Sequence, residues 1–138
     1  MIIVAGFSRL ELTVVEVQPP IHGCTEGGDV CVSAALRFDE FTGAINAWIH
    51  RDDWSGFISQ LRLLEQTRRG EALLESMTPG ELRLRFHSLD MAGHLGVEGE
   101  LVRFAEGHRR LSLQFPTLEF DPGMLAELVS ELATARRE

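Results

Sequence analysis

The chemistry open to this chain depends first on its histidines, of which His87 and His94 are the best placed. They bracket a short turn between two segments of alternating apolar and polar residues, so we expect both rings on one outer face of a hairpin. Imidazole exchanges a proton near neutral pH and is a common metal ligand. No third ligand stands at a matching spacing, and solvated loop histidines are the more common explanation. The pair supports an alternative hypothesis, a small-molecule or metal-dependent enzyme that uses both rings.

The other reactive side chains form no recognisable catalytic motif. His22, Cys24 and Cys31 give the pattern His-x-Cys-x6-Cys, whereas structural zinc sites use tighter ligand pairs, about two to four residues apart. Cys31 is better explained as a small buried residue. The nucleophile elbow, the phosphate-binding loop, the zinc-protease motif and the dinucleotide-binding glycine motif do not occur. We therefore predict no catalytic residue, no metal and no cofactor.

Acidic residues gather in two loops of the first half of the chain. Glu26 and Asp29 lie in a Pro- and Gly-rich loop, and Asp39 and Glu40 lie in a hairpin loop. We expect the two loops to converge at one end of a sheet, where the carboxylates would steer a basic partner. Ordinary loop polarity is the alternative.

A second polar group alternates with leucines further along the chain. Arg83 and Arg85 are expected opposite Glu100 and Glu98 on an outer sheet face, where cross-strand pairs stabilise a solvated surface or present it to a partner. Trp48 is predicted either as an exposed aromatic anchor or as a residue buried by a second layer. The predicted partner-binding residues are Glu26, Asp29, Asp39, Glu40, Trp48, Arg83, Arg85, Glu98 and Glu100.

The composition limits the partners that these residues could bind. The chain has 138 residues, 44% hydrophobic and 25% charged, which predicts a single domain over 1–138. Its 21 acidic and 13 basic residues give a net charge of −8, and all 13 basic residues are Arg. Nucleic-acid binding needs a clustered basic footprint, so the balance favours a basic protein partner or simple solubility. No segment has the length of a signal sequence or a membrane span, which predicts a soluble, cytoplasmic protein.

The first half of the sequence predicts three strands and a helix. The strands are expected at Arg9 to Val17 with a central bulge, at Val30 to Phe38 and at Ala44 to His50, the last two joined by a four-residue loop that ends at Gly43. The apolar spacing then changes to that of an amphipathic helix, with Asp52 or Asp53 as the N-cap. The helix stripe consists of Trp54, Phe57, Ile58, Leu61 and Leu64. A further helical turn or two is predicted over Glu71 to Met77.

The second half predicts three more strands and a closing helix. Like charges would meet in a shifted register, so Arg85 is expected opposite Glu98 and Arg83 opposite Glu100. A three-residue turn at Ala105 to Gly107 would set Gly99 between Leu84 and Leu113. The last helix begins at Asp121 and Pro122, and its stripe consists of Leu125, Leu128, Val129 and Leu132.

These elements predict an α+β fold with an antiparallel sheet of about six strands and two main helices on one face. The order is βββα-βββα. Leu-Arg-Phe occurs before the central hairpin of each half, and both helices share a glycine followed by two apolar residues. These similarities suggest an internal duplication.

The chain resembles the bacterial immunity proteins of the wall-associated-protein type. The resemblance runs from about Arg9 to Ala135 and rests on the element order, the Trp-led helix, the strand Leu-Arg-Leu-Arg-Phe and the closing helix Phe-Asp-Pro-Gly-Met-Leu-Ala-Glu-Leu. It implies a small cytoplasmic protein that binds and occludes a cognate toxin without a covalent step. It identifies no contact residue. A structural homodimer, formed through a strand edge or through the side that carries Trp48, is a third hypothesis beside the toxin-binding protein and the enzyme.

Overall fold

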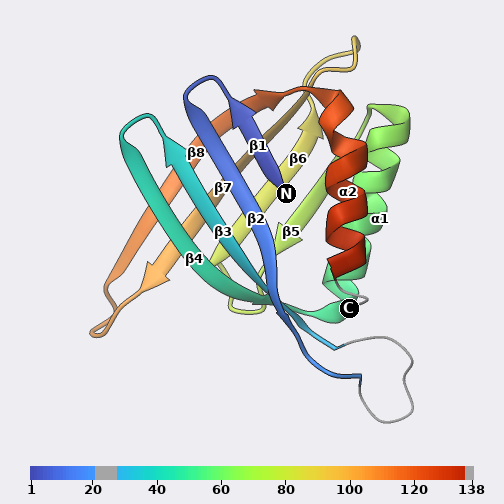
Figure 1. Ribbon diagram of the computed structural model, residues 1–138. Coiled ribbons are helices and arrows are strands. Elements are labelled where there is room, and N and C mark those ends of the chain that lie inside the picture. Colours follow the sequence, from blue (N-terminus) through green and yellow to red (C-terminus); the bar gives the residue numbers. More distant parts are fainter. Residues whose placement is uncertain (21–27, 136–138) are drawn as a thin grey trace.

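The computed structural model describes residues 1–20 and 28–135 as an α+β fold of two antiparallel sheets and two α-helices (Figure 1). Each sheet has four strands in chain order, β1-β2-β3-β4 in the first sheet and β5-β6-β7-β8 in the second. The elements are β1 (Ile2–Ala5), β2 (Ser8–Val17), β3 (Val30–Phe38), β4 (Phe41–Ile49), α1 (Arg51–Thr67), β5 (Glu71–Glu75), β6 (Leu82–Ser88), β7 (Leu95–Phe104), β8 (Arg110–Phe120), the 3-10 turn η1 (Pro122–Met124) and α2 (Leu125–Ala135). No helix within the described ranges is long and apolar enough to cross a membrane.

The prediction of one sheet with about six strands is wrong in strand number and in sheet number. The strands β1 and β5 were not predicted, and Glu71 to Met77 was expected to be helical. The sequence Glu-Ala-Leu-Leu-Glu of β5 consists of good helix formers. Ala72 and Leu74 are nevertheless buried on one side of an extended strand, opposite Phe86 and Leu84 of β6. Pairing with β6 and burial in the core therefore outweigh the helical preference of these five residues.

The two halves of the chain repeat the same order of elements. Four strands that pair with their sequence neighbours are followed by a helix in each half, with η1 before the second helix. The predicted βββα-βββα order is thus correct in its repetition and lacks the first strand of each half. The internal duplication itself stays a prediction.

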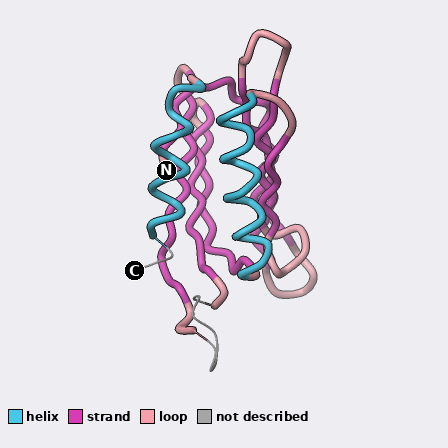
Figure 2. Tube along the Cα trace, turned by 90° about the vertical axis from the view of Figure 1, so that its right-hand side faces the viewer, coloured by secondary structure: helices cyan, strands magenta, loops and turns pink. Residues whose placement is uncertain are grey.

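A single apolar core lies between the two sheets and the two helices. The sheets form two layers in Figure 1, and Figure 2 shows α1 and α2 side by side along one side of the strands. A row of aromatic rings ties α1 to the second sheet: the centroids of Trp54 and Phe57 lie 5.7 Å apart, those of Phe57 and Phe86 5.7 Å, and those of Phe86 and Phe120 6.1 Å. The predicted helix stripes are confirmed, because all their members are buried.

The helix ends follow the predictions in part. Asp121 caps η1, where its Oδ1 accepts a hydrogen bond from the Gly123 N–H at 2.9 Å. At α1 the N-cap is His50, not Asp52 or Asp53, and its Nδ1 accepts from the Asp52 N–H at 3.2 Å. The helix begins at Arg51, two or three residues earlier than the predicted caps imply, so the N-cap is the histidine.

Charge pairing predicted the register of β6 and β7 correctly, with Arg85 opposite Glu98 and Arg83 opposite Glu100. The bulge in β2 is also confirmed, between Val14 and Glu16. The predicted loop before β4 is wrong: Phe38 pairs with Phe41, and the turn is only Asp39 and Glu40. Both registers keep the same residues on the buried face of β4. Alternation therefore could not distinguish them.

The predicted three-residue turn between β7 and β8 is wrong, because Phe104 pairs with Arg110 and the turn extends from Ala105 to Arg109. A bulge between Val97 and Gly99 shifts the register once more. Leu101 pairs with Leu113, and Gly99 pairs with Phe115 instead of with Leu113. Gly99 lies opposite Leu84, as predicted. A Cβ on Gly99 would lie 2.3 Å from the Arg83 carbonyl oxygen, so the backbones approach more closely here than any side chain allows.

Replacing Gly99 with Ala is expected to lower the free energy of unfolding by about 1–3 kcal/mol, because the added methyl group overlaps the β6 backbone. The control is Gly56→Ala on the exposed face of α1, where a Cβ would meet no atom within 4 Å. That variant should gain about 0.5–1 kcal/mol, since alanine favours a helix over glycine. Urea unfolding measures both, and a Gly99→Ala variant as stable as the wild type would contradict the close approach.

Candidate functional site

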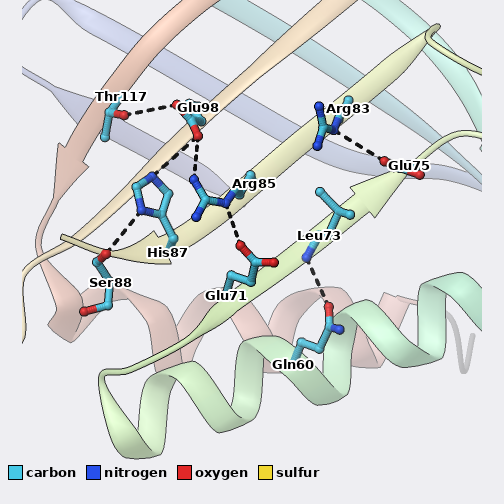
Figure 3. Close-up of polar contacts among 10 residues, drawn as sticks. All are labelled: Gln60, Glu71, Leu73, Glu75, Arg83, Arg85, His87, Ser88, Glu98 and Thr117. Carbon is cyan, nitrogen blue, oxygen red and sulfur yellow. Dashed lines mark hydrogen bonds and ion pairs between the residues drawn. The ribbon is translucent and has the colours of Figure 1, made fainter.

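A row of polar side chains crosses the outer face of the second sheet, one from each strand (Figure 3). Arg85 of β6 donates from Nε to Glu71 Oε2 at 2.6 Å and from Nη1 to Glu98 Oε1 at 2.8 Å. Thr117 Oγ1 donates to the other oxygen of Glu98 at 3.4 Å. We call Glu71, Arg85, Glu98 and Thr117 the polar row. It joins β5, β6, β7 and β8 by side-chain hydrogen bonds.

The charges in the polar row stabilise one another. Hydrogen bonding to Arg85 holds the pKa of Glu98 below its ordinary value, with smaller contributions from His87 and Thr117. Hydrogen bonds to Glu71 and then to Glu98 raise the pKa of Arg85. Two N–H groups of Arg85 are therefore bound within the protein, which is the arrangement of a structural ion pair.

The remaining predicted ladder residues have other neighbours. Arg83 lies opposite Glu100, but its ion pair is with Glu75 of β5, with Nε 3.4 Å from Oε1 (Figure 3). The sequence analysis missed Glu71 and Glu75 because they lie on the strand that it assigned to a helix. Their alternation with buried Ala72 and Leu74 is the signal that would have found them.

The two candidate histidines occupy different environments. His87 is largely buried, with 14% of its side chain exposed, and its Nδ1 lies 3.2 Å from the Ser88 carbonyl oxygen. Its Nε2 lies 3.8 Å from Glu98 Oε1 and makes no hydrogen bond. His94 is exposed and binds Asp90, with Nδ1 2.5 Å from Oδ2. Each ring thus has its own carboxylate, and no three ligating side chains in the described parts of the chain are grouped to hold a metal ion.

The Asp90–His94 pair closes the turn between β6 and β7. Asp90 Oδ1 accepts a hydrogen bond from the Ala92 N–H at 2.8 Å, and Oδ2 contacts the imidazole. The hydrogen bond to Asp90 raises the pKa of His94, and the same contact lowers the pKa of Asp90. These groups have a local role in the turn.

The acidic residues predicted to converge do not form one group. Asp29 lies just before β3, whereas Asp39 and Glu40 follow its far end, so the strand Val30–Phe38 separates them. Asp29 Oδ1 also accepts a hydrogen bond from the Arg51 N–H at the start of α1, at 3.0 Å. The sequence pattern placed both pairs in loops but did not show that these loops lie at opposite ends of one strand. Glu26, His22 and Cys24 lie outside the described residues.

Trp48 is half-buried on the outer face of the first sheet, opposite Cys31 of β3. Its carbonyl oxygen accepts a hydrogen bond from the Met77 N–H at 2.8 Å, so the segment between β5 and β6 lies beside it. Cys31 is buried as predicted, and burial, with smaller contributions from Glu16 and Glu81, raises the pKa of its thiol. Trp48 is thus neither a fully exposed anchor nor a core residue.

The most exposed aromatic side chains lie at two neighbouring hairpin turns. Phe7, in the turn between β1 and β2, is 83% exposed, and Phe41, at the start of β4, is 69% exposed. Together with Arg37, Asp39 and Glu40 they line a depression of about 570 Å³. We call these five residues the hairpin-tip patch. The sequence analysis missed both phenylalanines, although large apolar residues within turn sequences are a usable signal for such a surface.

The pKa of His94 is expected to lie above that of an ordinary histidine and to fall towards it in Asp90→Asn. The imidazolium contributes stability at low pH, and this contribution is lost as the pH rises through the raised pKa of His94. Because the pKa of Asp90 is lowered, the contribution on the acid side is lost only as the pH falls through that lower value. Proton NMR titration of the wild type and of Asp90→Asn measures the pKa of the His94 ring. An identical His94 titration in Asp90→Asn would disprove the pair.

The comparison with protein families agrees with the resemblance seen in the sequence. The chain matches the Immunity protein WapI-like family over residues 1–137. Neither the curated proteins nor the solved structures gave a match. Since the family match extends over almost the entire length, the chain belongs to the Immunity protein WapI-like family.

Proposed function

We propose that this chain is a non-enzymatic immunity protein that binds a basic protein toxin and blocks it by occupying its surface. The family match over residues 1–137 is the observation that carries the proposal. An immunity protein needs a surface that recognises its toxin, and it needs no catalytic group of its own.

The hairpin-tip patch has the features of such a surface. Exposed aromatic rings are common anchors of protein interfaces, and a depression between them offers room for a partner side chain. Phe7 and Phe41 come from separate hairpins and line the same depression with Asp39 and Glu40. The two carboxylates outweigh the single guanidinium of Arg37 in the patch, and the net negative charge favours a basic partner.

The polar row supports a structural role better than a binding role. Arg85 already binds Glu71 and Glu98, so a toxin carboxylate would have to displace one of these partners. Arg83 is likewise paired, with Glu75. We therefore assign toxin recognition to Asp39 and Glu40 among the predicted partner-binding residues, and we add Phe7 and Phe41.

The toxin is to be sought among the products of the genes next to this one, and we call its toxic region the toxic domain. We expect the purified chain to bind this domain and to restore growth when both are co-expressed. Phe41→Ala and Phe7→Ala should each weaken binding about tenfold or more, as truncation of aromatic anchors does. Titration calorimetry measures the affinity. Phe104→Ala is the matched control, because Phe104 is 49% exposed at the end of β7, whose turn to β8 lies apart from the β1–β2 and β3–β4 turns in Figure 1. Absence of binding to the toxic domain would overturn the proposed function.

The charge of the hairpin-tip patch should act mainly on the rate of association. The double variant Asp39→Asn, Glu40→Gln is expected to bind the toxic domain roughly tenfold more slowly at low salt, with little difference at high salt. Stopped-flow measurements over a range of salt concentrations test this. The double variant Asp53→Asn, Glu127→Gln removes the same charge from exposed helix positions and serves as control. Equal slowing in both double variants would show that only the net charge matters.

A further inference from the structure

Among the four strands at the sheet edges, β4 lacks the features that usually prevent a further strand from pairing. The strand β1 has only four residues. The strand β5 has Glu71 and Glu75 at its ends, and its Leu73 N–H donates to Gln60 Oε1 of α1 at 3.0 Å. The strand β8 contains Arg110, Pro116 and Glu119. The nine residues of β4, Phe-Thr-Gly-Ala-Ile-Asn-Ala-Trp-Ile, include neither a charge nor a proline.

The backbone of β4 presents free hydrogen-bonding groups on its outer edge. The Trp48 carbonyl accepts from Met77, so it points away from β3. In a strand that pairs without a bulge, the backbone N–H and C=O groups of every second residue point to the same side. The outward groups of β4 therefore also belong to Asn46, Ala44 and Thr42. All three residues are exposed, and no described residue forms a hydrogen bond with their outward backbone groups.

We propose that this edge, from Thr42 to Asn46, accepts an extended segment of the toxin as a fifth strand of the first sheet. The inference rests on the proposed function and gives it a binding mode. Pairing through the backbone would satisfy the outward N–H and C=O groups that are now unbonded. The edge begins beside Asp39 and Glu40, so the segment would carry basic residues at that end.

The outer face next to this edge restricts the side chains of the added segment. A second depression, of about 420 Å³, extends from β2 to β4 and includes Ala35, Thr42 and Ala44. Its charged residues are Arg9, Glu11 and Arg37, of mixed sign. The segment would therefore present small or β-branched uncharged side chains over Ala44, with its charge confined to the end near the acidic turn.

A second copy of this chain fits the edge poorly. An antiparallel pairing centred on Ala44 would set Thr42 of each copy against Asn46 of the other. The next outward position would then place Trp48 of one copy against Glu40 of the other. Met77 already lies on that side of Trp48. In such a dimer, Met77 of one copy would collide with the β3–β4 turn of the other copy. A single extended segment brings no such obstacle.

The test uses two synthetic probes, a peptide of alternating Thr and Val with a pair of Arg at one end, and the same peptide with Glu in place of Arg. We expect the Arg peptide, at up to millimolar concentration, to slow hydrogen exchange at the outward amides of Thr42 and Asn46. Its affinity should exceed that of the Glu peptide by at least about fivefold. Ala44→Pro removes an outward N–H and should weaken binding at least about tenfold, whereas Ala44→Val keeps the N–H and should bind like the wild type.

Asn46→Pro is the second variant in case Ala44→Pro does not fold, because its N–H also points away from β3. The proposal is overturned if the Arg peptide does not slow hydrogen exchange at Thr42 and Asn46. It is overturned too if every proline variant that folds binds the peptide as tightly as the wild type does. It is also overturned if sedimentation shows a dimer that a proline variant abolishes, which would assign the edge to a second copy. With the toxic domain, equal binding by the wild type and Ala44→Pro would exclude the strand addition and leave the proposed function intact.

Discussion

The fold depends on the aromatic row that joins α1 to the second sheet through the shared core. Trp54 and Phe57 come from the helix, Phe86 from a central strand and Phe120 from an edge strand, and neighbouring rings lie within 6.1 Å of one another. Such rings bury large apolar areas and prefer tilted contacts. Because α1 follows the first sheet in the chain and packs against the second, this row holds the two halves together around a shared core. Because both helices lie along one side of the strands, the outer faces of the two sheets carry no helix (Figures 1 and 2).

The parts of the fold that the sequence predicted well are those for which burial or charge selects one arrangement. The stripe that begins at Trp54 admits only one helix face, and the alternation of Arg85 with buried Leu84 and Phe86 allowed one register against Glu98. The prediction failed where two arrangements bury the same residues. The β3–β4 turn has two registers with the same buried face, and β5 is a strand only because β6 lies beside it. The division of the strands into two sheets depends on tertiary packing, and no local sequence pattern indicates it.

The candidate site was predictable to a smaller extent for the same reason. The contact between Arg85 and Glu98 follows from strand register, whereas Glu71 became its neighbour only through β5. Asp39 and Glu40 were recognised as acidic loop residues. Phe7 lies in a turn and Phe41 at the first position of a strand, where too few neighbours show the alternation that would reveal its exposure. Surfaces that bind partners are under no requirement to alternate, so their residues are found from exposure in the structure.

The two outer sheet faces differ in how their polar groups are satisfied, and this difference bears on function. On the second sheet, the polar row pairs its charges across β5, β6 and β7 and reaches β8 through the Thr117 hydroxyl, and Gln60 caps the edge strand β5. On the first sheet, the edge strand β4 has no charged residue, and among the described residues the backbone from Thr42 to Asn46 forms hydrogen bonds only with β3. An unprotected edge favours aggregation unless a partner or a competing charge covers it. The acidic turn at Asp39 and Glu40 lies at one end of this edge, and its negative charge would disfavour acidic chains and favour basic ones. Under the proposed function, this charge would discourage self-association and would still admit a basic strand from one partner.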